Sequence, residues 1–551
     1  MQRDSDDTWE ISIAEALDAH QYSDVLRLLD EQGEQSLGTT SWELIEKAFY
    51  AVDNYKLMES ERQERLEKNY VLPAVEEIGS EQIIDEMLHK LTSNITPKEL
   101  IMICLTAIRK IKTTYMFERI ARLVTELLNT ALKPNLARIL GALEILSGTL
   151  KTLSPPQEEQ LDNAEERILM DTNKKARTIN ERYRVVADFL EDNLRFVKKD
   201  YRDILRGTNA LKVGSYIVTP MESTLGLLDL CPPKKPTSSP SAQHSLAIRL
   251  KNDLNSIVDP IALLRLSKRV NERRTEHDEL AVPFISGAVF CYIVFCLDSD
   301  FPRVYSVSVL ADLLLTFSLA LTTSPKHMHV LKGLYLIKAA LPYIENCAEH
   351  DEIRLTIRRL LRSFLQVITT CSLTEAREYA LSCWRELYSK CLPDFQLEIV
   401  KSLFKSFEDS SIRAFLIDEW RKLVHTTSNF ADHQELIYTA AFLPGGVETD
   451  LLKHSDHIIS TLNVIRYSLY SKSLAKTHHL DKYLTDLRQA LDMSRAHYKL
   501  QLAAPPSDRR HLIQFPNIPR EMEEDMLNQA LTRFDLIEFV LAEVNANYDF
   551  K

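Results

Sequence analysis

The sequence predicts an all-α protein: a HEAT-like solenoid of antiparallel helix pairs in two halves. Apolar residues recur at spacings of three and four over most of the 551 residues, which is the period of an amphipathic helix. Only 12 glycines occur, so the turn-forming residues that a β-rich protein needs between its strands are scarce. Because no strict sequence period is visible, the predicted repeats are degenerate.

Several helix starts can be placed from the residues alone. Thr96-Pro97-Lys98-Glu99 combines a capping box with a proline at the first helical position. Ser154-Pro155, Ser324-Pro325 and the stretch from Ser372 to Glu375 mark further starts. Between these signals lie helices of ordinary length with short connections. That arrangement is typical of stacked antiparallel helix pairs.

Two stretches interrupt the helical pattern. The segment 231–243 (CPPKKPTSSPSAQ) is rich in proline and serine and cannot sustain a helix. It predicts an N-terminal helical repeat domain at 1–230, a linker at 231–243 and a C-terminal helical repeat domain at 244–551. Residues 207–223 just before it are expected to be irregular. The second break, 503–519, predicts a long loop before the last helix.

Charge and cysteine usage narrow the class of protein. The net charge of -12 disfavours a general nucleic-acid binder, which needs a basic face for phosphates. The start of the chain has no apolar run of the kind found in secretory signals. None of the eight cysteines forms a CxxC pair, which favours buried, reduced thiols. We therefore expect a cytoplasmic protein, with the nucleus as a further compartment.

One apolar stretch raises the alternative of a membrane protein. Residues 280–297 are long enough to span a bilayer, and a second apolar run follows at 304–323. Pro283 breaks the first run, and Asp312 interrupts the second. A helix buried on several sides in a large all-α protein has the same composition. We predict buried core helices and no membrane insertion, with a membrane hairpin as the alternative.

No pattern indicates an enzyme. The chain has no Gly-rich phosphate loop and no GxSxG elbow. His454 and His457 are spaced to share a metal on one helix, but no third ligand accompanies them, so they are interpreted as surface histidines. His478 and His479 are expected in a polar loop. The sequence predicts no catalytic residue, no cofactor and no metal site.

Four blocks near the end of the chain resemble one family. They are FLPGGVETDLLKHSD followed by IISTLNVIRY (442–467), LDMSRAHY (491–498), PNIPREM (516–522), and FDLIE with VLA (534–542). Their order and spacing are similar to those of the glomulin family. The resemblance is weaker between residues 245 and 440 and only architectural before that. The longer charged tail expected of the family does not follow the last block.

The resemblance implies a function. Members of the glomulin family are helical, HEAT-like repeat proteins that bind the RING domain of the RING-box subunit of cullin-RING (SCF-type) ubiquitin ligases. They cover the surface that receives the ubiquitin-conjugating enzyme and so inhibit ubiquitin transfer. That surface is largely apolar with a charged rim. Immunophilins are a further partner that the resemblance implies. The alternative function is a general helical scaffold or adaptor that binds an immunophilin or another signalling partner.

Helical phase then selects candidate partner-binding residues. In the last helix, a stripe from Met526 to Val544 is the expected core face, and Phe539 falls on the opposite side. In the helix before it, Met493 and Leu500 also fall off the core stripe. The predicted partner-binding residues are Met493, His497, Leu500, Asn528, Thr532, Asp535, Leu536 and Phe539. The competing interpretation is that another helix, or the loop 503–519, covers them.

Overall fold

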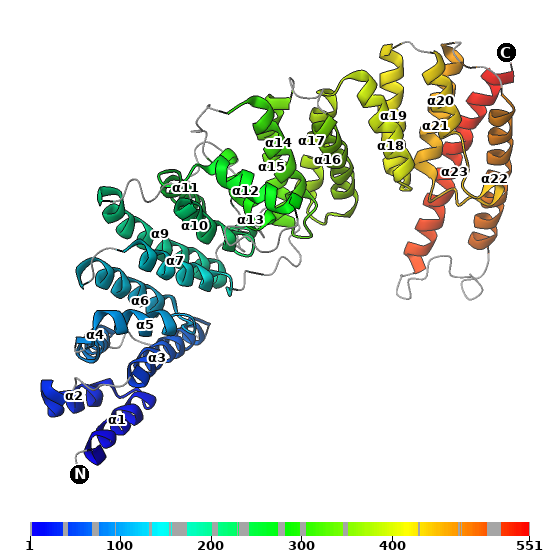
Figure 1. Cartoon of the computed structure of the whole chain (residues 1–551). Helices are drawn as coiled ribbons and strands as arrows, with labels where there is room; N and C mark the ends of the chain where they lie inside the picture. The colour runs from blue at the N-terminus through cyan, green and yellow to red at the C-terminus, as the bar shows by residue number, and fades with distance from the viewer. Residues whose placement is uncertain are drawn as a thin grey trace. The chain divides into compact units, whose positions relative to one another are not determined.

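The computed structural model describes residues 3–36, 42–68, 77–93, 95–131, 135–153, 156, 173–200, 208–228, 230, 242–273, 282–297, 305–344, 351–427, 430–471, 474, 477–503 and 520–549. Within these ranges the chain forms α-helices, short 3-10 segments and one π segment, and no strand (Figure 1). The all-α prediction is confirmed.

The chain groups into two compact units, 1–386 and 387–551, and the helix α17 (Thr374–Ser389) runs across the division. Unit 1 contains α1 (Arg3–Asp18), α2 (Tyr22–Ser36), α3 (Trp42–Lys68), α4 (Glu77–Ser93), α5 (Pro97–Ala107), α6 (Thr114–Glu126), η2 (Leu127–Ala131), α7 (Leu136–Leu150), α9 (Lys174–Asp200), α10 (Thr208–Val218), η3 (Thr219–Met221), η4 (Leu225–Leu227), α11 (Ala242–Asn255), α12 (Pro260–Arg273), α13 (Phe284–Cys296), α14 (Val307–Thr322), α15 (His327–Ile344) and α16 (Asp351–Thr370). Unit 2 contains α18 (Pro393–Ser406), α19 (Ser410–Thr427), α20 (Phe430–Ala440), η5 (Gly446–Glu448), α21 (Ser455–Tyr470), α22 (His478–Ala503) and α23 (Arg520–Asp549).

Helices in unit 1 stack as pairs. α12 packs against α13, and α14 packs against α15. The first helices of successive pairs also pack together, since α14 contacts both α12 and α16, and α13 contacts α15 in the second layer. Tyr335 on α15 meets Tyr379 on α17 with ring centroids 4.8 Å apart, which continues that layer. This two-layer stacking is the helix-pair solenoid that the sequence predicts.

The helix start at Thr96 is confirmed in detail. α5 begins at Pro97, and the Thr96 hydroxyl oxygen accepts a hydrogen bond from the backbone N–H of Glu99 at 3.5 Å. The same hydroxyl donates to the Glu99 carboxylate at 2.6 Å. The Ser154-Pro155 start lies outside the described residues.

The long apolar stretch forms core helices. On α13 every residue from Ser286 to Val294 is buried, and α14 is buried over most of its length. The prediction of buried helices is confirmed for these two. In the part of the chain that the structure describes, no helix has the combined length and apolar character needed to cross a membrane.

The region before the predicted linker is helical, so the expectation of irregular structure at 207–223 is wrong over most of its length. α10 covers Thr208–Val218, and η3 follows it directly. The amphipathic run from Ala210 to Val218 packs on α7 and α12, and this packing outweighs the helix-weakening Gly214.

Segments on both sides of the predicted linker pack together in unit 1. Lys332 on α15 is fully buried, and its ammonium group donates to the carbonyls of Gly226 at 2.8 Å and Leu228 at 2.6 Å. The Tyr292 hydroxyl on α13 donates to the Leu230 carbonyl at 2.7 Å. The division between the two compact units lies at 386. Residues 231–241 lie outside the described residues, and the linker stays a prediction.

The glycine turn of the first resemblance block leads into α21. Gly446 has a φ of +56°, a left-handed conformation that glycine adopts without strain. Asp450 then accepts hydrogen bonds from the backbone N–H groups of Leu452 and Lys453, at 3.0 and 3.1 Å. α21 itself begins at Ser455.

Two interpretations of histidines are corrected. His457 is buried rather than on the surface, and its Nε2 lies 2.9 Å from the carbonyl oxygen of Ala440. Its ring packs against Phe404 and Phe442, so the helix turns this position into the core of unit 2. His478 and His479 begin α22 instead of lying in a loop.

The described cysteines are free thiols, as the sequence predicts. Cys104, Cys291, Cys371, Cys383 and Cys391 are buried, and Cys296 is partly buried. Burial raises the pKa of the Cys104 thiol to about 12, which keeps this thiol protonated at neutral pH. The remaining two cysteines lie outside the described residues.

Candidate functional site

The last two helices of unit 2, α22 and α23, form an antiparallel pair (Figure 1). Near the start of α22, Asp481 accepts a hydrogen bond from the Tyr548 hydroxyl at 2.6 Å, near the end of α23. Further along α22, Tyr498 packs edge-on against Phe534 with ring centroids 5.2 Å apart. The pair is thus held at both ends and in one register.

An ion-pair network lies between the two helices. Arg495 on α22 bonds the carboxylate of Asp535 at 2.5 Å and also bonds that of Glu538. Arg488, two turns earlier on α22, lies 3.1 Å from Glu538. The hydrogen bonds from Arg495 hold the pKa of the Glu538 carboxyl below its usual range. Charges of opposite sign are therefore fixed beside the outer faces of both helices.

All eight predicted partner-binding residues are exposed. On α22 the exposed fractions are 53% for Met493 and 72% for Leu500. On α23 they are 45% for Leu536 and 61% for Phe539. The polar members of the set are also exposed, and these are His497, Asn528, Thr532 and Asp535. We call these eight residues the α22–α23 outer surface; their role in binding a partner stays a prediction.

The register of the helix pair places Met493 and Phe539 at similar heights along the axis of the pair. Met493 lies two residues before Arg495, and Phe539 lies one residue after Glu538. Since a helix rises about 1.5 Å per residue, the Arg495–Glu538 bond places Met493 and Phe539 within a few ångströms along the pair axis. The sequence predicts the two exposed stripes separately, but this alignment depends on the pairing of the helices.

The competing interpretation is that another helix, or the loop 503–519, buries the eight residues of the outer surface. No described segment covers the side chains of Met493, Leu500 and Phe539, given their exposed fractions. The loop that was expected to act as a cover, 503–519, lies outside the described residues except for Ala503, which is exposed.

Each of the two helices buries one stripe of residues. Leu480, Leu484, Leu487 and Leu491 are buried on α22, while Tyr498 is partly buried. On α23 the prediction fails at one position, because Met526 is 37% exposed and the adjacent Leu527 is buried instead. Val540 and Tyr548 are also buried there. Helical phase alone could not separate adjacent residues at the edge of the stripe.

Sequence reasoning missed a groove beside the outer surface. It lies between α22 and α23 and is lined by Leu484, Thr485, Arg488, Gln489, Asp492, Met493 and Asn545. Met493 therefore belongs both to the outer surface and to the rim of a groove. Residues of two helices form this groove, so no local pattern in either helix indicates it.

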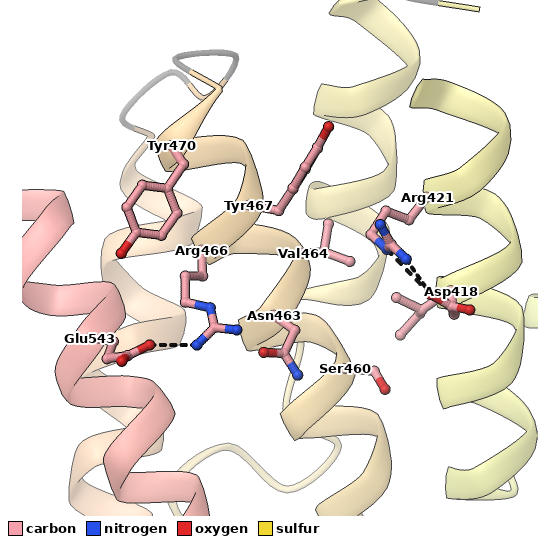
Figure 2. Close-up of a pocket in the computed structure, with 10 residues that line it drawn as sticks. Asp418, Arg421, Ser460, Asn463, Val464, Arg466, Tyr467, Tyr470 and Glu543 are labelled. Atoms are coloured by element: carbon pink, nitrogen blue, oxygen red, sulfur yellow. Dashed lines mark hydrogen bonds and ion pairs between the residues drawn. The ribbon is translucent and has the colours of Figure 1, made fainter. Parts of the chain in front are cut away.

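A second hollow in unit 2 also has no sequence signal. It has a volume of about 660 Å³ and lies among α19, α21 and α23. Figure 2 shows Arg421 bonded to Asp418 and Arg466 bonded to Glu543, with Tyr467 and Tyr470 above them. Both guanidinium groups are thus neutralised by carboxylates, and no group in this hollow is arranged as a nucleophile with a base.

The described residues contain no group of three histidine, cysteine or acidic side chains that could hold a metal ion.

Comparison with known proteins gives two curated relatives. Over 251 residues the chain is 29% identical to human glomulin, and over 255 residues it is 26% identical to mouse glomulin. Each match covers 40% of this chain and 42% of the relative, so the aligned stretch spans less than half the length of the curated relatives. No family model matches the chain.

Among solved structures, the chain is similar to a circular tandem repeat protein with novel repeat topology and enhanced subunit contact surfaces. That likeness covers 98% of this chain and 96% of the other at 10% identity, with a TM-score of 0.24. The curated matches agree with the resemblance carried by the sequence blocks near the end of the chain. The chain is therefore related to the glomulin family.

Proposed function

We propose that this protein is a non-enzymatic regulator that binds the RING domain of the RING-box subunit of cullin-RING ubiquitin ligases. In this role it masks the surface that receives the ubiquitin-conjugating enzyme and inhibits ubiquitin transfer. Through the RING-box subunit it would associate with the cullin, in the cytoplasm. The observation that carries the proposal is the similarity to glomulin.

The α22–α23 outer surface supports the proposal by its chemistry. The conjugating-enzyme surface of a RING domain is largely apolar with a charged rim. This protein would meet that surface with the exposed apolar side chains of Met493, Leu536 and Phe539. The charged groups of Asp535 and Arg495 lie beside them. Exposed apolar residues bordered by fixed charges are typical of a protein–protein interface.

The first test uses the full chain and a purified complex of the RING-box subunit with its cullin. We expect the chain to be retained on the immobilised complex and to slow ubiquitin transfer from a charged conjugating enzyme. Adding excess conjugating enzyme should relieve the inhibition, because both proteins would compete for one surface. Failure to bind, or binding with undiminished transfer, would reject the proposal.

A double substitution locates the contact. Leu536→Asp with Phe539→Asp places two carboxylates where the proposal needs apolar contact, and we expect loss of both binding and inhibition. The matched control in unit 2 is Leu392→Asp, at an apolar residue that is 53% exposed and lies at the N-cap of α18. If the folded double variant still inhibits fully, the outer surface is not the contact. If it fails to fold, the two residues belong to a buried interface instead.

An adaptor that binds an immunophilin or another signalling partner is the alternative function. In the same experiment it gives no retention by the RING-box complex. Retention by an immobilised immunophilin in place of that complex would then support the alternative.

A further inference from the structure

A cleft in unit 1 carries a charge opposite to that of the chain as a whole. It has a volume of about 910 Å³ and lies against α12, α14 and α16. Its lining has five cationic side chains, which are Arg265, Lys268, Arg269, Arg359 and Arg362. Two carboxylates, Glu272 and Asp312, also line it, so the balance is five minus two, or three positive charges. The whole chain carries a net charge of -12.

The carboxylates do not neutralise the arginines. Asp312 bonds Lys268, and Glu272 lies 3.6 Å from the same ammonium group. Among the residues that the structure describes, neither Arg359 nor Arg362 has a carboxylate within ion-pair distance, and the same holds for Arg269. All three are exposed. Unpaired guanidinium groups at a cleft are available to an incoming carboxylate.

The cationic groups stand on two opposite sides of the cleft. Arg265 and Arg269 lie one turn apart on α12, and Arg359 and Arg362 lie one turn apart on α16. The helix between them is α14, since it packs against both α12 and α16. Two cationic walls therefore border the surface of α14.

The floor between these walls is partly apolar. Val309, Leu313 and Leu319 of α14 line the cleft, and Phe284 of α13 joins them. Leu355 on α16 also lines it and is 46% exposed. A free phosphate or a nucleic-acid backbone would leave this apolar area exposed to water. A ligand with both carboxylates and apolar side chains would cover the floor and meet both walls.

We infer that the cleft among α12, α14 and α16 is a docking site for an acidic, amphipathic peptide segment of a partner protein. Its apolar side chains lie on α14 and beside Leu355, and its carboxylates pair with Arg265 and Arg269 on one wall and with Arg359 and Arg362 on the other. This site is separate from the proposed RING contact, because all of its residues belong to unit 1. A negative result for the RING contact would therefore not affect the proposed peptide site, and a negative result for the peptide site would not affect the RING contact.

Fluorescence anisotropy with the full chain tests the inference. The probe is a labelled 20-residue synthetic peptide of glutamate and leucine, with leucines at helical spacing. A second peptide replaces its leucines by serine, and a third replaces its glutamates by glutamine. We expect the first to bind at least about tenfold more tightly than either of the others, and its affinity to fall as salt rises.

Charge-reversal variants locate the binding. Arg359→Glu with Arg362→Glu should weaken binding of the first peptide by about tenfold or more. Arg265→Glu with Arg269→Glu should do the same from the other wall, and it serves if the first variant does not fold. The matched control is Arg138→Glu, an exposed residue in the first turn of α7, where a carboxylate suits the helix dipole. It should change affinity less than about twofold, since its charge lies outside the cleft.

The apolar contact has its own control. Leu355→Ser should weaken the binding of the leucine peptide severalfold. It should leave the weak binding of the serine peptide unchanged. Met102→Ser, at a residue that is 56% exposed on α5, should have no effect.

Three outcomes would overturn the inference. Equal affinity for the leucine and serine peptides would mean that only charge is recognised. Equal weakening by Arg138→Glu would mean that binding is not at the cleft. Arginine-dependent binding to vesicles of anionic phospholipid, without binding to the leucine peptide, would assign the cleft to a membrane surface.

Discussion

Arg495 on α22 bonds Asp535 on α23 at 2.5 Å, and the same guanidinium group also bonds Glu538. The side chain of Arg495 is 18% exposed, so this contact is better shielded from solvent than most surface ion pairs. It couples the two helices whose outer faces carry Met493 and Phe539. The pair of helices, rather than either helix alone, therefore defines the candidate surface.

Replacing Arg495 should loosen this coupling. Arg495→Met keeps the aliphatic stem and removes both ion pairs, and we expect a loss of about 1 kcal/mol in the free energy of unfolding, because Asp535 is itself exposed. Urea unfolding measures the change. Arg533→Met is the control, since its ion pair with Asp456 is more exposed on the arginine side and should contribute less. An equal loss of unfolding free energy in both variants would contradict the expectation that the ion pairs of Arg495 contribute more than the exposed pair of Arg533.

Replacing the exposed apolar residues should affect binding and not stability. The side chains of Leu536 and Phe539 are about half in water, so Leu536→Asp with Phe539→Asp should change the free energy of unfolding by less than about 1 kcal/mol. The neighbouring Ile537→Asp should instead be severely destabilising, because Ile537 is fully buried. Thermal unfolding separates the two cases. Comparable destabilisation would mean that the outer surface is covered.

The buried His457 should make stability depend on pH. Burial lowers the pKa of its imidazole to about 4, with the nearby Arg413 acting in the same direction, against an ordinary value of 6.5. Between these two values the unfolded chain binds a proton that the folded chain does not. Stability is therefore full above about pH 6.5 and falls as the pH drops towards 4, by up to about 1.4 kcal/mol per pH unit for this group.

His457→Gln tests this dependence, because glutamine can still donate to the Ala440 carbonyl but does not titrate. Urea unfolding at pH 7 and pH 5 should show a smaller difference in the variant than in the original chain. His497→Gln, at an exposed position, is the control and should leave the difference unchanged. An unaltered pH dependence in His457→Gln would show that the proton uptake occurs elsewhere.

Lys332 should be essential for the stability of unit 1. Lys332→Met leaves the buried carbonyls of Gly226 and Leu228 without their donor, which should cost about 2–4 kcal/mol. Lys338→Met, which removes a 3.1 Å ion pair with Glu386 on a 35% exposed side chain, should cost well under half as much. Chemical unfolding compares the two. A small effect at Lys332 would mean that the segment before 231 is held by its apolar contacts alone.

The sequence by itself determined the helical class, the start of α5, the buried character of α13 and α14, and the position of all eight outer-surface residues off the core stripes of their helices. These features depend on local period, on capping residues and on the phase of apolar positions, which a single helix expresses without its neighbours. Blocks of residues near the end of the chain also indicated the glomulin relationship.

Only the tertiary structure decided how these helices meet. It buried His457 against Ala440, paired Arg495 with Asp535, and brought the arginines of α12 and α16 to opposite sides of one cleft. It also joined Lys332 to η4, about a hundred positions earlier in the chain. Such contacts link residues that are distant in sequence, and neither periodicity nor composition carries information about which helix faces which. The physical reason is that packing depends on the complementarity of two surfaces, whereas a sequence pattern describes only one.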